Sequence, residues 1–445
     1  MSLIPFGFWA ASGASAAVTY WLATLGGASV EYGFSVATDS SNSSYQFGNT
    51  ESTGAGSADF LLAKRDTLGA VQWQRTLGGA SSEAGSATAI DSSDNVYVFG
   101  NTLSEGPGNT SLVLAKYNSS GAIQWQRILG DTGAELGRGI AIDVSDNIYL
   151  AGSTVSEGAG LSDFFLAKYN TSGTIQWQRI LGGAGADDAQ AVATDSAGNV
   201  YIAGYSTSSG AGSYDFLFAK YNSSGTIQWQ RTLGGTDMEF CRGLTIDSSD
   251  NIYLSGETDP GAGGGDDFLV AKYNSSGTIQ WQRTLGGSGT DDGHGIVVDS
   301  SDNVYVFGDS NSEGEGSDDF VIAKYNSSGT IQWQRILGST GLEFAYSVAI
   351  DSSETLNLSG LTNGTGEGSF DFLLAKVPND GSLTGTYVLD GVDFVYAAST
   401  LTAATSTLTS ATSSLTAATS TLTSSTSTLT DSSASLTSHF VEIPA

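Results

Sequence analysis

Short apolar runs alternate with turn residues along most of the chain, and the arrangement returns every 52 residues. In one copy the runs are Ala189–Asp195, Asn199–Gly204, Asp215–Tyr221 and Thr226–Leu233. They are rich in β-branched or aromatic residues and are bounded by Gly, Asn, Asp or Ser, which is typical of β-strands. The turn Asn222–Gly225 ends in a glycine, which can adopt the positive φ of a tight hairpin. The pattern predicts four antiparallel strands per copy.

Four residue series mark the copies, and no insertion shifts their spacing. The tryptophans are Trp21, Trp73, Trp125, Trp177, Trp229, Trp281 and Trp333. The aspartates are Asp39, Asp91, Asp143, Asp195, Asp247, Asp299 and Asp351. The lysines are Lys64, Lys116, Lys168, Lys220, Lys272, Lys324 and Lys376. The arginines are Arg75, Arg127, Arg179, Arg231, Arg283 and Arg335. A repeat of this length predicts one repeat architecture for most of the chain.

Seven units of four strands predict a β-propeller, with a linear solenoid as the competing architecture. The ends of the array favour the ring. The chain enters on a lone fourth-type strand, Val18–Leu25, and leaves after a third-type strand, Asp371–Lys376, with Gly385 where the next Trp would stand. We therefore expect an all-β fold: a seven-bladed β-propeller of four-stranded antiparallel blades over residues 18–386. Pairing of the first strand with the last blade would close it and remove its exposed edge.

The C-terminal segment carries a second repeat, of period seven. Its leucines are Leu401, Leu408, Leu415, Leu422, Leu429 and Leu436. Apolar residues spaced three and then four apart are typical of a heptad helix. Residues 399–438 are therefore predicted to form an oligomeric stalk, a homotrimer held by its Leu seam. Because Ser and Thr are mediocre helix formers, a disordered polar linker and a β-type fibre stay open as alternatives.

Three shorter segments flank these two repeats. Residues 1–17 are predicted to be an apolar arm, residues 387–398 a hairpin or linker, and residues 439–445 an apolar tip. The first basic residue is Lys64, so the start lacks the positive region of a secretory signal and we expect it to stay uncleaved.

The chain is strongly acidic, and this limits its partners. It has 46 acidic and 16 basic residues, a formal net charge of −30. Such a surface repels nucleic acid and acidic membranes, and no apolar run reaches the length needed to insert into a bilayer. Neither nucleic acid nor membrane insertion is expected. The single cysteine, Cys241, allows no intrachain disulfide.

An acidic residue follows each Trp by ten positions: Glu31, Glu83, Glu135, Asp187, Glu239, Asp291 and Glu343. A ring of these carboxylates near a channel mouth would concentrate negative potential and could hold Ca²⁺, the one cofactor that the sequence suggests. Alternatively, each carboxylate accepts backbone N–H groups and fixes its loop. The Asp39 series is expected to shape turns, and the Lys64 series to place its ammonium near an Asp. The Arg75 series should form an inter-blade ion pair or stack on an aromatic ring.

Little in the sequence favours an enzyme. The chain has two histidines, His294 and His439, and one cysteine, so a Ser-His-Asp triad or a zinc site of His and Cys ligands is hard to assemble. His294 is expected in a solvated loop between blades. Paired carboxylates for glycoside cleavage remain open because acids are abundant.

Two segments resemble known proteins. The motif of Asp91–Gly100, which recurs at Asp299–Gly308, and the Asp371–Lys376 strand resemble the tandem β-propeller repeat family of large secreted bacterial proteins and some phage proteins. This resemblance implies a propeller with a binding or scaffolding role and no single reaction. The segment Leu3–Ala11 is similar to N-termini of structural proteins of marine tailed phages.

Together these features predict a non-enzymatic virion structural protein of a tailed phage, a tail fibre, spike or head decoration located on the extracellular particle. Its propeller would bind a host-surface glycan or protein, and its termini would contact other virion proteins. The alternatives are a secreted bacterial cell-surface adhesion or scaffold protein and a polysaccharide-degrading enzyme.

Overall fold

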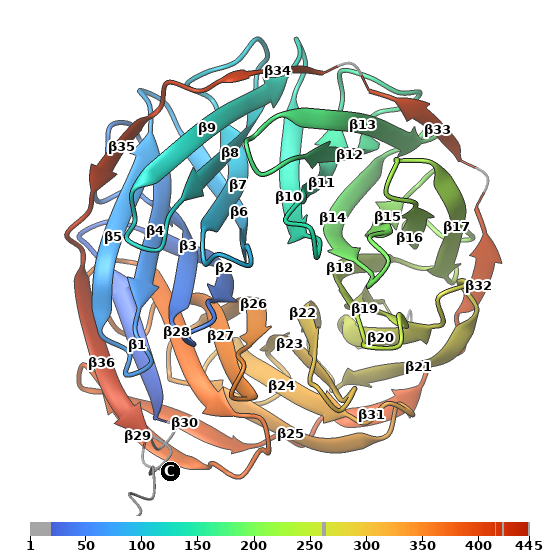
Figure 1. Cartoon of the computed structure of the whole chain (residues 1–445). Helices are drawn as coiled ribbons and strands as arrows, with labels where there is room; N and C mark the ends of the chain where they lie inside the picture. Colours follow the sequence, from blue (N-terminus) through green and yellow to red (C-terminus); the bar gives the residue numbers. More distant parts are fainter. Residues whose placement is uncertain (1–18, 260–263, 414, 421, 444–445) are drawn as a thin grey trace, which may run out of the picture.

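A computed structural model describes residues 19–259, 264–413, 415–420 and 422–443. Seven antiparallel sheets surround a central channel (Figure 1), which confirms the all-β seven-bladed propeller. The described residues contain only strands and connecting segments, so no helix among them is long and apolar enough to cross a membrane. The predicted arm, residues 1–17, lies outside the described residues.

The blades are numbered along the chain, and each runs from the channel outward. Blade 1 contains β2 (Glu31–Thr38), β3 (Ser44–Thr50), β4 (Asp59–Arg65) and β5 (Val71–Gly78). Blade 2 contains β6 (Glu83–Ile90), β7 (Val96–Thr102), β8 (Ser111–Tyr117) and β9 (Ile123–Gly130). Blade 3 contains β10 (Glu135–Ile142), β11 (Ile148–Thr154), β12 (Asp163–Tyr169) and β13 (Ile175–Gly182). Blade 4 contains β14 (Asp187–Thr194), β15 (Val200–Ser206), β16 (Asp215–Tyr221) and β17 (Ile227–Gly234).

The remaining blades follow the same plan. Blade 5 contains β18 (Glu239–Ile246), β19 (Ile252–Thr258), β20 (Asp267–Tyr273) and β21 (Ile279–Gly286). Blade 6 contains β22 (Asp291–Val298), β23 (Val304–Ser310), β24 (Asp319–Tyr325) and β25 (Ile331–Gly338). Blade 7 contains β26 (Glu343–Ile350), β27 (Thr355–Thr362), β28 (Asp371–Pro378) and the first strand of the chain, β1 (Tyr20–Gly26).

Strand β1 closes the ring, as the sequence predicts. It pairs antiparallel with β28 from Trp21 opposite Lys376 to Leu25 opposite Phe372. Trp21, Leu22, Ala23 and Leu25 are fully buried. Blade 7 is therefore assembled from both ends of the repeat array, and no blade edge of the ring is left open at the junction.

The repeated polar residues hold each blade together and join it to the next. Each Lys of the series pairs with the Asp of its own blade, with an Nζ–Oδ2 distance of 3.0 Å for Lys64 and Asp39. Trp73 donates its indole N–H to Ser119 O of the following blade (3.2 Å), and Arg75 donates to Gly121 O (2.7 Å) while stacking on Trp73. The expected Lys–Asp contact and the Arg–aromatic stack are confirmed.

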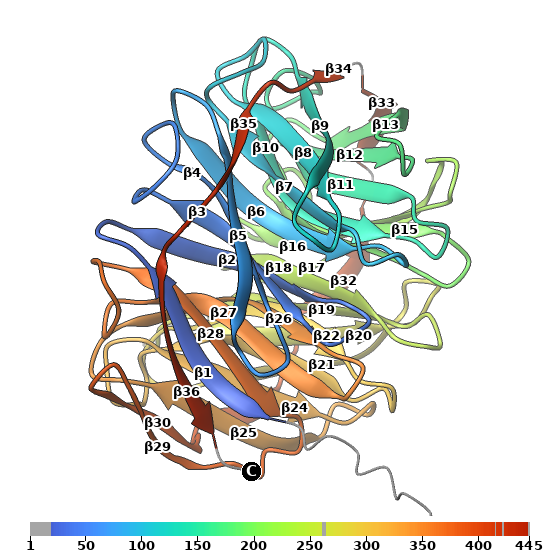
Figure 2. The same cartoon turned by 60° about the vertical axis from the view of Figure 1, so that its left-hand side comes forward.

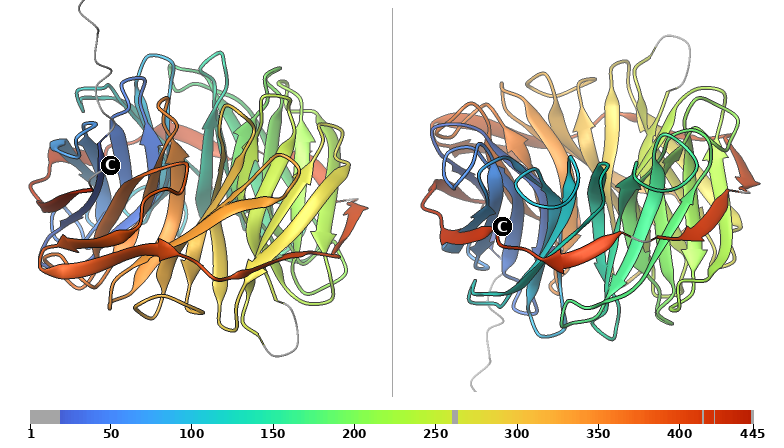
Figure 3. Two further views of the ribbon diagram at one scale, coloured as in Figure 1. Left: turned by 90° about the horizontal axis from the view of Figure 1, so that it is seen from below. Right: turned by 90° about the horizontal axis from the view of Figure 1, so that it is seen from above.

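The C-terminal segment forms a belt of strands around the ring, so the predicted helical stalk is wrong (Figures 1–3). A hairpin of β29 (Gly385–Leu389) and β30 (Val392–Ala398) adds to blade 6. The belt then passes backwards around the ring, one strand per blade, from blade 5 to blade 1 and then to blade 7. Its strands are β31 (Thr402–Thr405), β32 (Thr409–Thr412), β33 (Thr416–Thr419), β34 (Thr423–Thr426), β35 (Thr430–Ser433) and β36 (Thr437–Ile443). Six blades thus have five strands and blade 6 has six, in place of the predicted four.

The seven-residue period of the belt corresponds to the spacing of the blades. Each leucine of the series packs into a different core cluster; Leu401, Leu422 and Leu429 are at most 5% exposed. The side-chain amide of Gln178 in β13, the fourth strand of blade 3, donates to Leu422 O of the belt (2.9 Å). The fourth strands of five other blades make the same contact with the belt. A strand rises about 3.3 Å per residue, so seven extended residues span about 23 Å at most. One heptad is therefore the length of belt that leads from one blade to the next.

Candidate functional site: the channel mouth

The innermost strand of every blade carries a β-bulge close to its start. In blade 1 the pairing of β2 with β3 passes from Gly33 to Ser35, which leaves Phe34 as the extra residue. The six other innermost strands shift at the equivalent place. Bulges re-aim side chains next to functional sites. Here they turn one side chain per blade towards the channel.

The bulge residues differ from blade to blade although the scaffold hardly changes. They are Phe34, Ser86, Arg138, Gln190, Arg242, His294 and Tyr346. All seven line two adjoining hollows of the channel, each of about 300 Å³. A hollow of about 690 Å³ on the outer wall is lined by Trp281 and Arg283, which belong to the repeated series. The channel is therefore where the copies diverge, and we call the end at which the innermost strands begin the mouth.

Aromatic side chains gather in two places at the mouth. The rings of Phe34 and Tyr346, from blades 1 and 7, meet edge to face with centroids 4.8 Å apart, and Tyr32 stacks on Phe34 at 5.7 Å. In the second group Phe240 of blade 5 packs against Tyr205 and Tyr214 of blade 4, with centroids at 4.8 and 4.7 Å. These half-buried rings offer flat apolar faces together with phenol hydroxyl groups.

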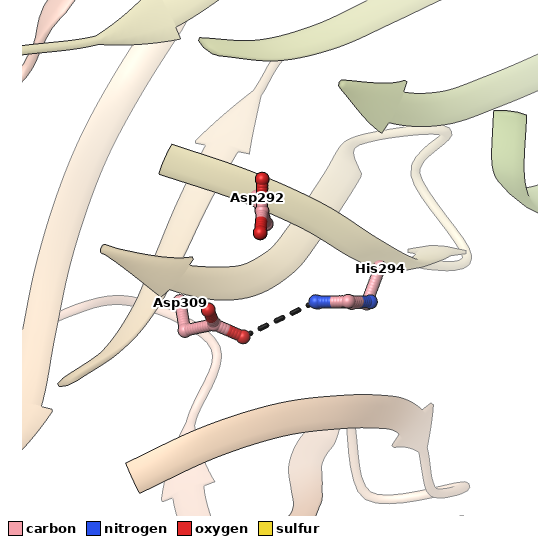
Figure 4. Close-up of side chains that lie close together, drawn as sticks. All are labelled: Asp292, His294 and Asp309. Carbon is pink, nitrogen blue, oxygen red and sulfur yellow. Dashed lines mark ion pairs between the residues drawn. The ribbon is translucent and has the colours of Figure 1, made fainter. Parts of the chain in front are cut away.

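Blade 6 brings two acids and a histidine together at the mouth (Figure 4). Asp292 and Asp309 lie directly opposite each other on β22 and β23. His294 Nε2 lies 3.2 Å from Asp309 Oδ1. On blade 5, Arg242 forms a two-pronged contact with Glu257, at 2.7 and 3.2 Å. Burial, together with the charges of Glu257 and Asp309, raises the pKa of Asp292 to about 7.

His294 is the site residue that the sequence analysis placed wrongly. The expected solvated loop between blades is in fact strand β22, and the side chain is only 18% exposed. Counting 13 residues from each Trp would have found it, because the position so defined changes residue type in nearly every copy. The β-bulge that makes this position face the channel leaves no mark in the sequence of a single copy.

The seven predicted ring acids lie inside the blades at the same end of the channel. All are at most 1% exposed, and each accepts a backbone N–H from four residues earlier; Gly27 N to Glu31 Oε2 is 2.7 Å. The other six bonds are equivalent. A Ser or Thr hydroxyl nineteen residues later also donates to each carboxylate, as Thr50 does to Glu31 at 2.7 Å. The loop-fixing role is thus present in every blade, and Ca²⁺ binding by these residues stays a prediction.

A second carboxyl, buried or half-buried, lies beside six of the seven ring acids, across the boundary between blades. It is the first residue of the third strand: Asp59, Asp163, Asp215, Asp267, Asp319 and Asp371, with Ser111 in blade 2. Burial raises the pKa of Asp319 to about 7, and the charge of Glu343 in the next blade adds to the shift. The same causes, with Glu31 as the neighbour, raise the pKa of Asp371 to about 6.

Comparison with known protein families supports a tandem β-propeller repeat family. The Beta-propeller repeat family matches residues 124–157, 176–210 and 280–315. A β-propeller domain family of unknown function, DUF5122, matches residues 198–227. These segments belong to blades 2–6 and lie within the repeats that the Trp series marks.

Curated relatives are distant and longer. An uncharacterized WD repeat-containing protein of Acanthamoeba polyphaga mimivirus is 22% identical over 541 aligned residues, which cover 85% of this chain and 39% of the relative. The regulatory protein FlaEY of Caulobacter vibrioides is 30% identical over 119 residues, 24% of this chain and 12% of the relative. The chain thus spans well under half the length of either.

Solved structures share only the general architecture. The polysaccharide lyase Uly1 is 10% identical, with a TM-score of 0.48 over 79% of this chain and 91% of that one. A gluconolactonase from Xanthomonas campestris is 13% identical, with a TM-score of 0.35 over 64% of this chain and 90% of that one. Likeness at this level carries no information about activity.

Proposed function

We propose that the protein is a non-enzymatic binding module whose mouth recognises a host-surface glycan or protein. The observation that carries this proposal is the divergence of the seven bulge residues on an otherwise repeated scaffold. A purely structural ring would keep the same residue at equivalent positions, as it does for Trp, Asp, Lys and Arg. A binding site needs different groups around one ligand.

The chemistry of the mouth favours a glycan over a protein. Aromatic rings such as Phe34 and Tyr346 can stack on the apolar face of a sugar, and the Arg242–Glu257 pair and Gln190 supply donors and acceptors for hydroxyl groups. The opening is concave and lies at the centre of a rigid ring, which limits the ordering cost of binding.

A glycan array followed by titration of the best ligand tests the proposal. Phe34→Ser and Tyr346→Ser, which introduce the residue that blade 2 carries at this position, should weaken binding at least tenfold. Val144→Ser, at an exposed apolar residue in the turn after β10 and therefore away from the mouth, is the control and should leave the affinity unchanged. Equal affinity in all four proteins would place the ligand elsewhere and contradict the proposal.

For the biological setting we propose a virion structural protein, a tail fibre, spike or head decoration of a tailed phage. Its support is the resemblance of Leu3–Ala11 to phage structural proteins and the limited catalytic chemistry of the sequence. Mass spectrometry of purified particles should find the chain with its N-terminus intact. Cleavage near Ala16 would instead favour the secreted bacterial surface protein.

A polysaccharide-degrading enzyme is the second candidate, because Asp292 and Asp309 present two carboxyl groups opposite each other at the mouth. Product analysis on every glycan that binds distinguishes the two functions. Cleavage that disappears in Asp309→Asn would establish the enzyme, and recovery of intact glycan supports the binding module.

A further inference from the structure

We infer that Asp292, His294 and Asp309 form a binding site for one divalent transition-metal ion, of the Zn²⁺ class, at the channel mouth. The site goes beyond the proposed glycan or protein binding and does not depend on it, since metal binding can be measured without any other ligand.

The three side chains are already grouped as ligands. Their nearest ligand atoms all lie within 4.8 Å of one another, with His294 Nε2 and Asp309 Oδ1 3.2 Å apart. Two ligands at the tetrahedral angle, each about 2.1 Å from a Zn²⁺ ion, are about 3.4 Å apart, close to this distance. The backbone holds the set in place, because Asp292 and Asp309 are cross-strand partners and His294 occupies the bulge of β22 (Figure 4).

Among the described residues, neither Asp292 nor Asp309 forms an ion pair with a lysine or arginine. Like charges directly opposite on two strands are destabilising, and Arg242, whose charge acts on Asp292, is engaged with Glu257. Asp292 Oδ1 is shielded from solvent and has no hydrogen-bond partner among the described residues. A buried acceptor left without a partner destabilises the folded chain. A bound cation would satisfy the oxygen and separate the two carboxylates.

The repeated scaffold does not require the combination of Asp292, His294 and Asp309. The three equivalent positions hold Tyr32, Phe34 and Asn49 in blade 1, and no other blade combines two acids with a histidine there. Asp309 Oδ1 does accept Ala345 N–H (3.1 Å), as Asn101 Oδ1 accepts Gly137 N–H (2.7 Å). Because asparagine serves that purpose in blade 2, the carboxylate of Asp309 is not needed for it.

The mixture of donor atoms indicates the class of metal. Ca²⁺ and Mg²⁺ prefer sites built entirely from oxygen, whereas imidazole suits Zn²⁺ and its neighbours. Three protein ligands also leave a coordination position towards the channel, as in sites where Zn²⁺ holds water or a ligand. We therefore expect Zn²⁺ to bind more tightly than Ca²⁺.

Calorimetric titration of the full chain with ZnCl₂ at physiological ionic strength tests the inference, with CaCl₂ as a parallel titrant. The wild type should bind one equivalent of Zn²⁺ saturably, and Asp292→Asn and His294→Gln should weaken it at least tenfold. Matched controls come from blade 4, where Asp188 and Gln190 hold the equivalent positions. Asp188→Asn and Gln190→Ala should leave Zn²⁺ binding unchanged.

Anomalous scattering from Zn²⁺-soaked wild-type crystals provides a test that needs no variant. A peak within bonding distance of the three side chains supports the site. Absence of that peak, absence of saturable Zn²⁺ binding, affinities that do not change in Asp292→Asn and His294→Gln, or tighter binding of Ca²⁺ than of Zn²⁺ would each overturn it.

Discussion

At the scale of single residues, the least expected feature is the set of carboxyl pairs buried between blades. Asp319 of blade 6 lies beside Glu343 of blade 7, and neither is exposed. One oxygen of Asp319 has no hydrogen-bond partner among the described residues. A proton shared by the two carboxyl groups would remove both the repulsion and the missing bond.

The stability of the protein should therefore depend on pH through this pair. The folded pKa of Asp319, about 7, is above its ordinary value of 3.8, so between these values the folded chain keeps a proton that the unfolded chain loses. Stability from this group is fully present at low pH and decreases as pH rises towards 7. Asp319→Asn should raise the free energy of unfolding at pH 8 by about 2 kcal/mol and change it little at pH 4.

Denaturant unfolding at the two pH values measures this effect. Asp237→Asn, at an exposed acid, is the control and should change stability by less than about 0.5 kcal/mol at either pH. A loss of stability in Asp319→Asn at pH 8 would show that the ionised pair is favourable and that this account is wrong. Ser111, which holds the equivalent position in blade 2, already indicates that a neutral residue is accepted there.

At the scale of elements, β1 differs from the other fourth strands because it comes from the opposite end of the repeat array to the rest of its blade. This strand lies between β28 and β36, and its Trp21 is fully buried, whereas Trp177 of the equivalent strand in blade 3 is half-buried. Both indoles donate to a carbonyl oxygen of the next blade, at 3.3 and 3.1 Å. Trp21 and Trp177 therefore differ mainly in their burial. They also differ in that only the strand of Trp21 closes the ring by pairing the start of the chain with its last blade.

This difference leads to a matched comparison. Trp21→Ala should destabilise the protein by about 3–5 kcal/mol, the usual cost of removing a large buried ring, and Trp177→Ala by clearly less. Urea unfolding midpoints of the two variants measure the effect. Equal losses would mean that the closing strand contributes no more than any other outer strand.

The strands also show which parts of the fold can be predicted from the sequence. Trp, Asp, Lys and Arg at a constant spacing were enough to predict blades, strand limits and closure, because each blade buries the same set of side chains. The leucines from Leu401 to Leu436 were not enough, since a period of seven fits both a heptad helix and one strand per blade. Threonines flank most belt strands and are poor in helices. The belt strands pair with the fourth strands of blades that lie far away in the sequence, and the heptad pattern alone does not identify these partners.

At the scale of the whole molecule, the belt covers strand edges that would otherwise be exposed. Deleting residues 399–445 would uncover the outer edges of six blades, from β1 to β21. Such edges pair readily with other chains. We expect the shortened protein to self-associate, measured by light scattering, and to unfold at a lower temperature than the intact chain.

Two controls make this prediction specific. Deleting residues 1–17 removes no described strand and should leave the light scattering unchanged. Adding a synthetic peptide of residues 399–443 to the shortened protein should reverse its association by replacing the missing strands. A shortened protein with unchanged mass and melting temperature would show that the belt is not required to protect the ring.

The pairing of β1 with β36 has a mechanical consequence. Tyr20 lies opposite Ile443, so a force applied at these two residues pulls neighbouring strands apart from the same end. The hydrogen bonds between them would then break one after another rather than together. Stretched between these two residues, the protein should unfold at low force and release its belt one blade at a time. A force applied to opposite sides of the ring would instead be resisted by several blades together.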